Sequence, residues 1–489
     1  MKGEDIYNGV TEIRGDLVEE AGSAVKKRRP MKKRALGAVA AVLAAALVAG
    51  YFLWPGSSPA VTEGYAICEA EYPEMAPYPD ESALYTLDPN DEAAYEAAYA
   101  EFEAQYDAWW DDVYARRNLD NHAAGLADYL TSGTAQFLSG AEGKNRALSP
   151  VNVYMALAML AELTDGESRA QLLELLGAED IGALRETAGD VWNAAYRDDG
   201  AITSVLAASV WLREDMDYNQ ETMEALAEYY SASSYSGEMG SGEYDEAYRA
   251  WLNEQTGGLL GDAAAESGFD AETVLALAST VYFRSKWSDE FSLDKTESGV
   301  FHGAAGDTEA EFMRSSGSGY YYWADKFSAV AQGLESGGGM WFILPDEGVG
   351  VDELLAEGSY MELALNPGEW ADSTYIIINR SIPKFDISSG IDLADGLKAL
   401  GVTDVFDAET SDFSPMSDME GVFVSSASHN ARVAIDEEGV TAAAFTELAM
   451  AGAAAPPEEE VDFIVDRPFI FVITTPNSLP LFVGVVNAP

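Results

Sequence analysis

The segment from Val433 to Pro457 constrains the fold of this chain more than any other. Val433 and Ile435 alternate with small or polar neighbours, which predicts a strand. Two acids and a glycine follow, and then alanine-rich runs that end at a double proline. Alanine favours a helix, but a strand enters this segment and a double proline cannot continue a helix. Taken alone, these residues describe a strand that leads into a flexible, alanine-rich surface loop.

The same segment resembles the hinge and reactive loop of the serpins, inhibitors that trap serine proteases by a conformational change. The residues that match the family's hinge are Glu437, Glu438, Gly439, Ala442, Ala443, Ala444 and Thr446. Val440 and Thr441 depart from it, and Phe445 is larger than usual. The resemblance implies a loop that slides into a sheet as a new strand. The side chains that would then face inward are Val440, Ala442, Ala444, Thr446 and Leu448, and none of them is charged.

Further motifs of the family follow in the correct order over residues 119–489. They include a helix start at Ser149-Pro150 and the segments 251–258, 274–287, 339–345, 382–385, 397–406, 463–471 and 480–487. The resemblance implies an α+β chain with the serpin fold, in which about nine helices surround three β-sheets and a reactive-centre loop is exposed. Periodicity alone predicts only a mixed protein with a large sheet.

The family's usual distance from the hinge implies a reactive bond at Ala453–Ala454. Alanine suits the shallow, apolar primary pocket of elastase-like or some subtilisin-like proteases. Trypsin-like enzymes need Lys or Arg there, because their pocket holds a buried acid. About four extra residues beyond the double proline leave the bond open between Met450 and Ala455.

The resemblance also implies a polar cluster beneath the main sheet that holds it shut, the shutter, formed by Ser149, Asn152, Ser279 and His429. The family has serine at the position of Asn152 and asparagine at the position of Ser279. We therefore expect the hydroxyl and the amide to exchange roles in one hydrogen-bond network with His429. Trp287 is expected in the breach, where the loop enters the sheet. The simpler interpretation of the His429 and Trp287 rings is that they belong to the ordinary core.

Composition excludes several classes of function. The chain has 84 acidic against 28 basic residues and a net charge of -56. This disfavours nucleic acids and heparin-type activators, whose phosphates and sulfates need Lys and Arg. Its single cysteine, Cys68, excludes an internal disulfide. With three histidines and no nucleophile elbow, zinc-protease motif, P-loop or cysteine pair, the chain is not expected to be an enzyme or to need a metal or cofactor.

The N-terminus predicts a membrane anchor. Residues 1–34 are polar and end in a basic run, and residues 35–54 carry no charge and no proline. A span of this length crosses a bilayer core of about 30 Å, and the basic run keeps the N-terminus cytoplasmic. A cleaved signal peptide is the rival interpretation. In either case the rest of the chain is extracellular, at the cell surface or secreted, and the arrangement suggests a bacterial-type serpin.

Residues 55–118 predict an acidic stalk between the anchor and the serpin domain. Its first part is proline-rich and typical of an extended linker. From Asp91 to Arg117 the spacing predicts a helix with one aromatic face, formed by Tyr95, Tyr99, Phe102, Tyr106, Trp109 and Val113. This face could dock on the following domain, associate with another stalk, or bind a partner.

The sequence therefore predicts a suicide inhibitor of elastase-like serine proteases that is tethered to the cell surface. The alternative is a non-inhibitory serpin-fold binding or surface-sensor protein, which would not need loop insertion. A hydrolase is disfavoured by the missing catalytic residues.

Overall fold

A computed structural model of the chain describes residues 59–79, 91–117, 126–141, 143–200, 202–258, 267–335, 337–440 and 459–489, with residues 84, 87 and 457. They belong to one compact unit, residues 59–489. The predicted basic segment 1–34 and the predicted span 35–54 lie outside the described residues. Among the residues that are described, no helix has the length and apolar character needed to cross a membrane.

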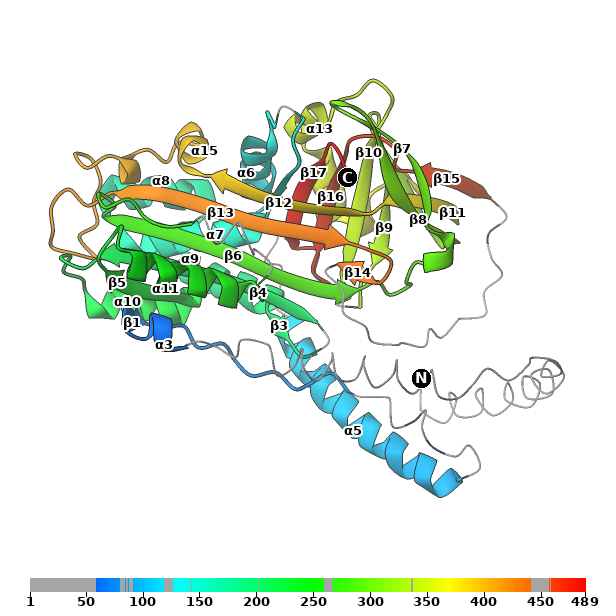
Figure 1. Cartoon of the computed structure of the whole chain (residues 1–489), viewed down its shortest axis with the longest axis horizontal. Coiled ribbons are helices and arrows are strands. Elements are labelled where there is room, and N and C mark those ends of the chain that lie inside the picture. The colour runs from blue at the N-terminus through cyan, green and yellow to red at the C-terminus, as the bar shows by residue number, and fades with distance from the viewer. Residues whose placement is uncertain are drawn as a thin grey trace. The chain divides into compact units, whose positions relative to one another are not determined.

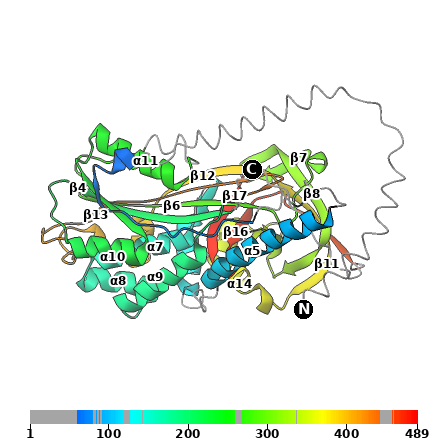
Figure 2. The same ribbon diagram turned by 90° about the horizontal axis from the view of Figure 1, so that it is seen from below.

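The main sheet is built around two long, largely buried strands, β4 (Thr203–Arg213) and β6 (Leu275–Lys286). Its order is β1 (Ala66–Cys68), β5 (Ala232–Gly237), β4, β6, β14 (Gly439–Val440), β13 (Val424–Ile435) and β12 (Phe385–Asp392), and β3 (Arg197–Asp198) pairs with β4. Strands β4 and β6 are buried along most of their length, because both faces of the sheet are covered by helices (Figure 2). Such burial explains their nearly continuous runs of apolar and small residues.

The second sheet packs beside the main sheet (Figure 1). Its order is β15 (Glu460–Ile464), β11 (Ser373–Pro383), β8 (Gly306–Trp323), β9 (Phe327–Gly333), β10 (Gly339–Pro345), β16 (Phe469–Thr474), β17 (Pro480–Val486) and β2 (Arg146–Leu148), and β7 (Glu297–Gly303) pairs with β8. Three sheets were expected, and hydrogen bonding joins the described strands into two. The reason is the length of β8, which pairs with β11 along its course and with β9 at its end.

Helix α7 (Pro150–Leu163) is the central helix, and every one of its residues is buried. Ser149 begins it as the N-cap, with proline in the first turn. On its side of the main sheet lie α8 (Gly166–Leu176), α9 (Ile181–Ala195) and α10 (Gln220–Tyr230), whereas α11 (Gly242–Gln255) covers the opposite face (Figure 2). Helix α6 (Ala127–Leu138) contacts α7. The other helices among the described residues are α3 (Pro59–Thr62), α5 (Glu92–Arg117), α13 (Val351–Glu357), α14 (Ser359–Leu365) and α15 (Ala394–Ala399), with the short turns η1 (Leu293–Lys295), η2 (Pro367–Glu369) and η3 (Asp404–Phe406).

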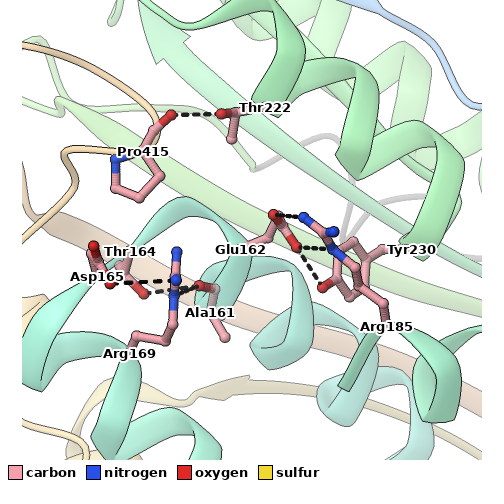
Figure 3. Close-up of polar contacts among 9 residues, drawn as sticks. All are labelled: Ala161, Glu162, Thr164, Asp165, Arg169, Arg185, Thr222, Tyr230 and Pro415. Carbon is pink, nitrogen blue, oxygen red and sulfur yellow. Dashed lines mark hydrogen bonds and ion pairs between the residues drawn. The ribbon is translucent and has the colours of Figure 1, made fainter. Parts of the chain in front are cut away.

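A buried acid ties three of these helices together (Figure 3). Glu162 on α7 receives two hydrogen bonds from Arg185 on α9, at 2.9 and 2.5 Å, and one from the Tyr230 hydroxyl on α10, at 2.9 Å. Burial, together with the neighbouring Glu162 carboxylate, raises the pKa of Tyr230. The bidentate pair compensates for burying the carboxylate. These contacts fix the helix layer on which the main sheet rests.

The segment before the helix layer departs from the expected linker. Residues 66–68 add β1 to the edge of the main sheet by pairing with β5. Helix α5 covers the stretch for which aromatic spacing predicts a helix, and its C-terminal half docks on the domain. There the buried Trp109 donates its indole N–H to Asp199 at 2.9 Å, and Val113 is also buried. Tyr95 and Tyr99 on the N-terminal half stay exposed, and so does Tyr106 just past the middle of the helix.

Candidate functional site

Strands β6 and β13 form a parallel contact that ends before the strands do. They pair from Leu275 and Val424 to Thr280 and Asn430. We call this contact the seam. Above it β14 lies between the two strands, with Gly439 opposite Lys286 and Val440 paired with both Ser285 and Ile435. The first two residues after the predicted hinge acids are therefore already part of the main sheet, at the upper end of the seam.

A tight turn from Asp436 to Gly439 brings β14 into this position. The Asp436 carboxylate accepts hydrogen bonds from the backbone N–H groups of Glu438 at 2.9 Å and Gly439 at 3.2 Å. The backbone N–H of Asp436 donates to the carbonyl of Gly439 at 3.1 Å. A Cβ atom on Gly439 would lie 2.4 Å from the carbonyl oxygen of Ser285, so only glycine allows the backbones to approach this closely.

Glu437 anchors the turn to the body of the protein. Its carboxylate accepts a hydrogen bond from the Thr296 hydroxyl at 2.6 Å and pairs with the Lys384 ammonium at 3.2 Å. Its carbonyl accepts from the backbone N–H of Phe291 at 2.9 Å. Burial acts to raise the pKa of Glu437, but the hydrogen bonds and the Lys384 charge outweigh it, so the pKa lies below its ordinary value.

Trp287 lies beside the same turn, as the sequence predicts for a breach residue. Its indole N–H donates to the carbonyl of Asp436 at 2.8 Å, and its backbone N–H donates to the carbonyl of Glu438 at 3.0 Å. The ring is almost fully buried. Trp287 therefore contacts the hinge turn directly as well as the core.

The predicted shutter residues meet beneath the seam. The buried His429 ring accepts a hydrogen bond at Nε2 from the backbone N–H of Ser149 at 2.9 Å. Its Nδ1 lies 3.1 Å from the Ser279 hydroxyl oxygen. Because Nε2 accepts, the ring proton of neutral His429 is on Nδ1 and points at Ser279. Burial lowers the pKa of His429 to about 4, so the ring is neutral at ordinary pH.

Asn152 departs from the expected network. Its backbone N–H donates to the Ser149 hydroxyl at 3.3 Å, but its fully buried amide group has no hydrogen-bond partner among the described residues. Ser279 thus contacts His429, whereas the side-chain amide of Asn152 forms no hydrogen bond with the ring. The sequence shows that serine and asparagine have changed places between positions 152 and 279, but it could not predict which of the two side chains contacts the His429 ring.

The sequence alone did not point to two partners of the hinge, Lys384 and Thr296. Lys384 lies in the motif 382–385, which resembles a strand of the family and carries no predicted site residue. The lysine forms its pair with Glu437, which lies 53 positions further along the chain. A basic residue is scarce in so acidic a chain, and this scarcity is the signal that could have drawn attention to Lys384.

Comparison with known proteins identifies the architecture. The sequence model of the family described as "Serpin (serine protease inhibitor)" matches residues 131–489. The chain belongs to the serpin family. The wheat protein Serpin-Z2B is 30% identical to this serpin over 71% of the chain and 90% of the relative.

Solved structures agree on the fold. The native-state crystal structure of the thermophilic serpin tengpin has 24% sequence identity and a TM-score of 0.66, over 75% of this chain and 93% of that one. Human thyroxine-binding globulin has 20% identity and a TM-score of 0.65, over 77% of this chain and 99% of that one. Because the sequence identities are below 25%, these two structures show only that the chain has the serpin fold, which is α+β in class. Serpins as a family are protease inhibitors and not enzymes.

Part of the predicted serpin site lies outside the described residues. This holds for the inserting positions Ala442, Ala443, Ala444 and Thr446 and for the bond Ala453–Ala454. The structure describes the hinge Glu437 to Val440, where this loop leaves the main sheet, and Glu459, from which the chain continues into β15. In the described part of the chain, no group of three or more His, Cys, Asp or Glu side chains is arranged to hold a metal ion.

Proposed function

We propose that this serpin is a suicide inhibitor of elastase-like serine proteases, and that its loop, once cleaved, inserts into the main sheet along the seam. One observation carries the proposal: β14 already lies between β6 and β13, antiparallel to both. Continuing β14 downward requires only that the seam separate. The shutter contact between Ser279 and His429 spans the seam and would have to open as the strand advances.

The register of β14 fixes which loop residues would occupy the seam. Continued opposite β6, it brings residue 446 opposite Ser279, and continued opposite β13 it brings the same residue opposite His429. Residue 450 would lie opposite Leu275, the first residue of β6. The main sheet therefore has room for the loop down to Met450, which leaves Ala453–Ala454 just beyond its end.

The same register supports the predicted inward set. Ser279 and His429 face helix α7, since His429 bonds the backbone of Ser149, and directly opposed residues in a sheet share a face. Thr446 would then face inward, and with it Val440, Ala442 and Ala444. All are small or apolar, as a slot against a fully buried helix demands.

Insertion would supply the free energy for trapping. Each inserted residue gains ladder hydrogen bonds on both sides and buries apolar surface, which stabilises by about 25 cal/mol per Å². The protease remains joined to the cleaved loop as an acyl ester. Moving it to the far end of the seam before hydrolysis would distort its active site.

Target class follows from the residues near the bond. Alanine at positions 453 and 454 fits a shallow apolar pocket, so the proposed partners are elastase-like and, second, subtilisin-like proteases. The net charge of -56 would favour encounter with basic proteases.

We further propose that residues 35–54 anchor this serpin as a single-pass, bacterial-type membrane protein, with residues 1–34 in the cytoplasm and the serpin domain, residues 119–489, outside the cell. The basic run before an uncharged apolar segment supports this topology. Cell fractionation after expression of the full chain tests it. Release from membranes by carbonate washing, or N-terminal processing beyond residue 54, would contradict a retained anchor.

The inhibitory function is tested by mixing residues 56–489 with pancreatic elastase, and separately with trypsin. We expect a denaturant-resistant complex with elastase on gels, and a new N-terminus at Ala454 in the released peptide. Clean cleavage without a complex would contradict trapping, and would favour the non-inhibitory binding or surface-sensor alternative.

A further inference from the structure

An exposed aromatic pair lies on the outer face of the second sheet. Tyr320 on β8 and Tyr375 on β11 are directly opposed in the strand register. Their ring centroids are 5.2 Å apart in an edge-to-face arrangement. Their exposed fractions are 56% and 53%. Two adjacent tyrosines with so much free ring surface make an apolar, hydrogen-bonding patch of the kind found at protein interfaces.

Strand alternation shows that these rings face away from the core. Ile376 and Ile378, which share the other face of β11, are buried, whereas Tyr375 is exposed. The outward face continues from Tyr375 through Ile377 on β11 and to the exposed acids of β15. We define the outer patch as Tyr320, Tyr375, Ile377, Glu460 and Asp462.

The outer patch lies where the loop rejoins the sheet. The backbone N–H of Ile377 donates to the carbonyl of Glu459 at 2.9 Å, and Ile377 is opposite Glu460 in the parallel register of β15. Tyr375 is two residues from that point along β11. Glu460 lies six positions after Ala454, a stretch that spans at most about 20 Å when extended. A protease seated on the proposed bond would therefore stand over or beside the outer patch.

The charges around the tyrosines are mainly acidic. Glu459, Glu460 and Asp462 are exposed along the edge strand. Asp462 accepts a hydrogen bond from the Asn379 amide at 2.9 Å, and the Ser316 hydroxyl donates to the Asn379 carbonyl oxygen at 2.8 Å. These contacts hold the acidic edge in place. An aromatic centre with an acidic rim is complementary to a surface with an apolar spot among Lys and Arg residues.

We propose that the outer patch is a second docking site for the target protease. It contacts basic surface on the protease, beside the part of the protease's active-site cleft that holds the C-terminal half of the loop. This inference rests on the proposed inhibitory function and deepens it. The loop sequence selects the primary pocket, and the outer patch selects among proteases that share that pocket. Aromatic side chains at such positions often carry much of the binding free energy.

The experiment replaces both tyrosines, Tyr320→Ser with Tyr375→Ser, and uses Tyr218→Ser as the matched control. Tyr218 is 40% exposed and precedes α10, which lies at the opposite end of the protein from β15 (Figure 1). For each variant, the second-order rate constant of complex formation with pancreatic elastase and the stoichiometry of inhibition are measured. The thermal unfolding midpoint verifies folding.

We expect the double variant to form the complex at least tenfold more slowly, at unchanged stoichiometry, because the loop and the seam are intact. Tyr218→Ser should behave as the wild type. Glu460→Lys should slow complex formation about threefold and weaken its dependence on salt, since it reverses one charge of the rim.

The outcomes separate the two proposals. If the wild type forms the complex and the double variant forms it within twofold of the control rate, the docking site is overturned and the inhibitory function stands. A wild-type chain that elastase cleaves without a complex overturns the inhibitory function, and the docking site with it. A lower rate accompanied by a higher stoichiometry would show a damaged loop mechanism and would also overturn the docking site.

Discussion

Ser279 on β6 and His429 on β13 face each other across the seam, with Oγ and Nδ1 3.1 Å apart. This is a side-chain contact between the two strands that the loop would have to separate. Both residues are almost fully buried, so the contact is not weakened by competing water. Its strength should set part of the barrier to insertion.

Removing the Ser279 hydroxyl should weaken the closed sheet. We expect Ser279→Ala to reduce the free energy of unfolding by about 1–2 kcal/mol, since Nδ1–H of His429 loses a buried partner. Asn152→Ser should cost less than about 0.5 kcal/mol or stabilise, because the amide it removes has no partner among the described residues. Denaturant unfolding of the two variants measures this. An equal loss in both would mean that Asn152 belongs to the network after all.

Acidification should weaken the protein through His429. Its pKa is lowered from 6.5 to about 4 in the folded protein, so the unfolded chain takes up the proton first as pH falls. The stabilisation is complete above about pH 6.5 and is lost as pH falls toward 4, by an amount on the order of 3 kcal/mol. The difference in stability between wild type and His429→Gln should shrink over this range. A difference that stays constant between pH 7 and 4.5 would show that the ring does not titrate as described.

The hinge turn should depend on the carboxylate of Glu437. We expect Glu437→Gln to lower the free energy of unfolding by about 1–3 kcal/mol, because the variant keeps the shape but removes the buried one of the two carboxylates that pair with Lys384, leaving only the exposed Glu311. The pKa of Glu437 lies below its ordinary value, so its contribution is present above the unfolded pKa and lost as pH falls through the folded one. Glu438→Gln, whose side chain is exposed, is the control. Equal midpoints for the two variants would contradict the anchoring role.

The contacts of Glu162 should matter more than those of an exposed acid on a neighbouring helix. Glu162→Ala leaves the Arg185 guanidinium and the Tyr230 hydroxyl without the carboxylate that joins them (Figure 3). We expect a loss of about 2–4 kcal/mol in unfolding free energy. Glu167→Ala on α8 should change it by less than about 0.5 kcal/mol. Similar effects of the two substitutions would show that the pair is not a structural link.

Loop substitutions should separate cleavage from trapping. Ala444→Arg places a charge on the face that would turn toward α7, and Ala443→Arg places it on the outward face. We expect elastase to cleave Ala444→Arg without forming a stable complex, while Ala443→Arg still traps the enzyme. Gels and residual protease activity report this. Trapping by Ala444→Arg would contradict the register derived from β14.

The sequence predicted the serpin fold because its motifs are local and follow one another in order. It also predicted that Ser149, Ser279 and His429 meet, although they come from three distant segments. It could not predict that β8 joins two expected sheets into one, which depends on strand length and pairing partners. Nor could it predict the role of Lys384, whose partner Glu437 becomes a neighbour only when β12 lies beside β13. The edge strand β1 was hidden in a segment whose prolines are typical of a linker.

The most direct test of insertion at the seam is the unfolding midpoint of the chain after a non-target protease has cut it within residues 441–456. If the freed strand enters between β6 and β13, the midpoint should rise by more than about 10 °C, and amides of β6 and β13 should exchange more slowly with solvent. Cleaved Ala444→Arg should show neither change. A cleaved wild-type chain that unfolds at the same temperature as the intact one would contradict the account.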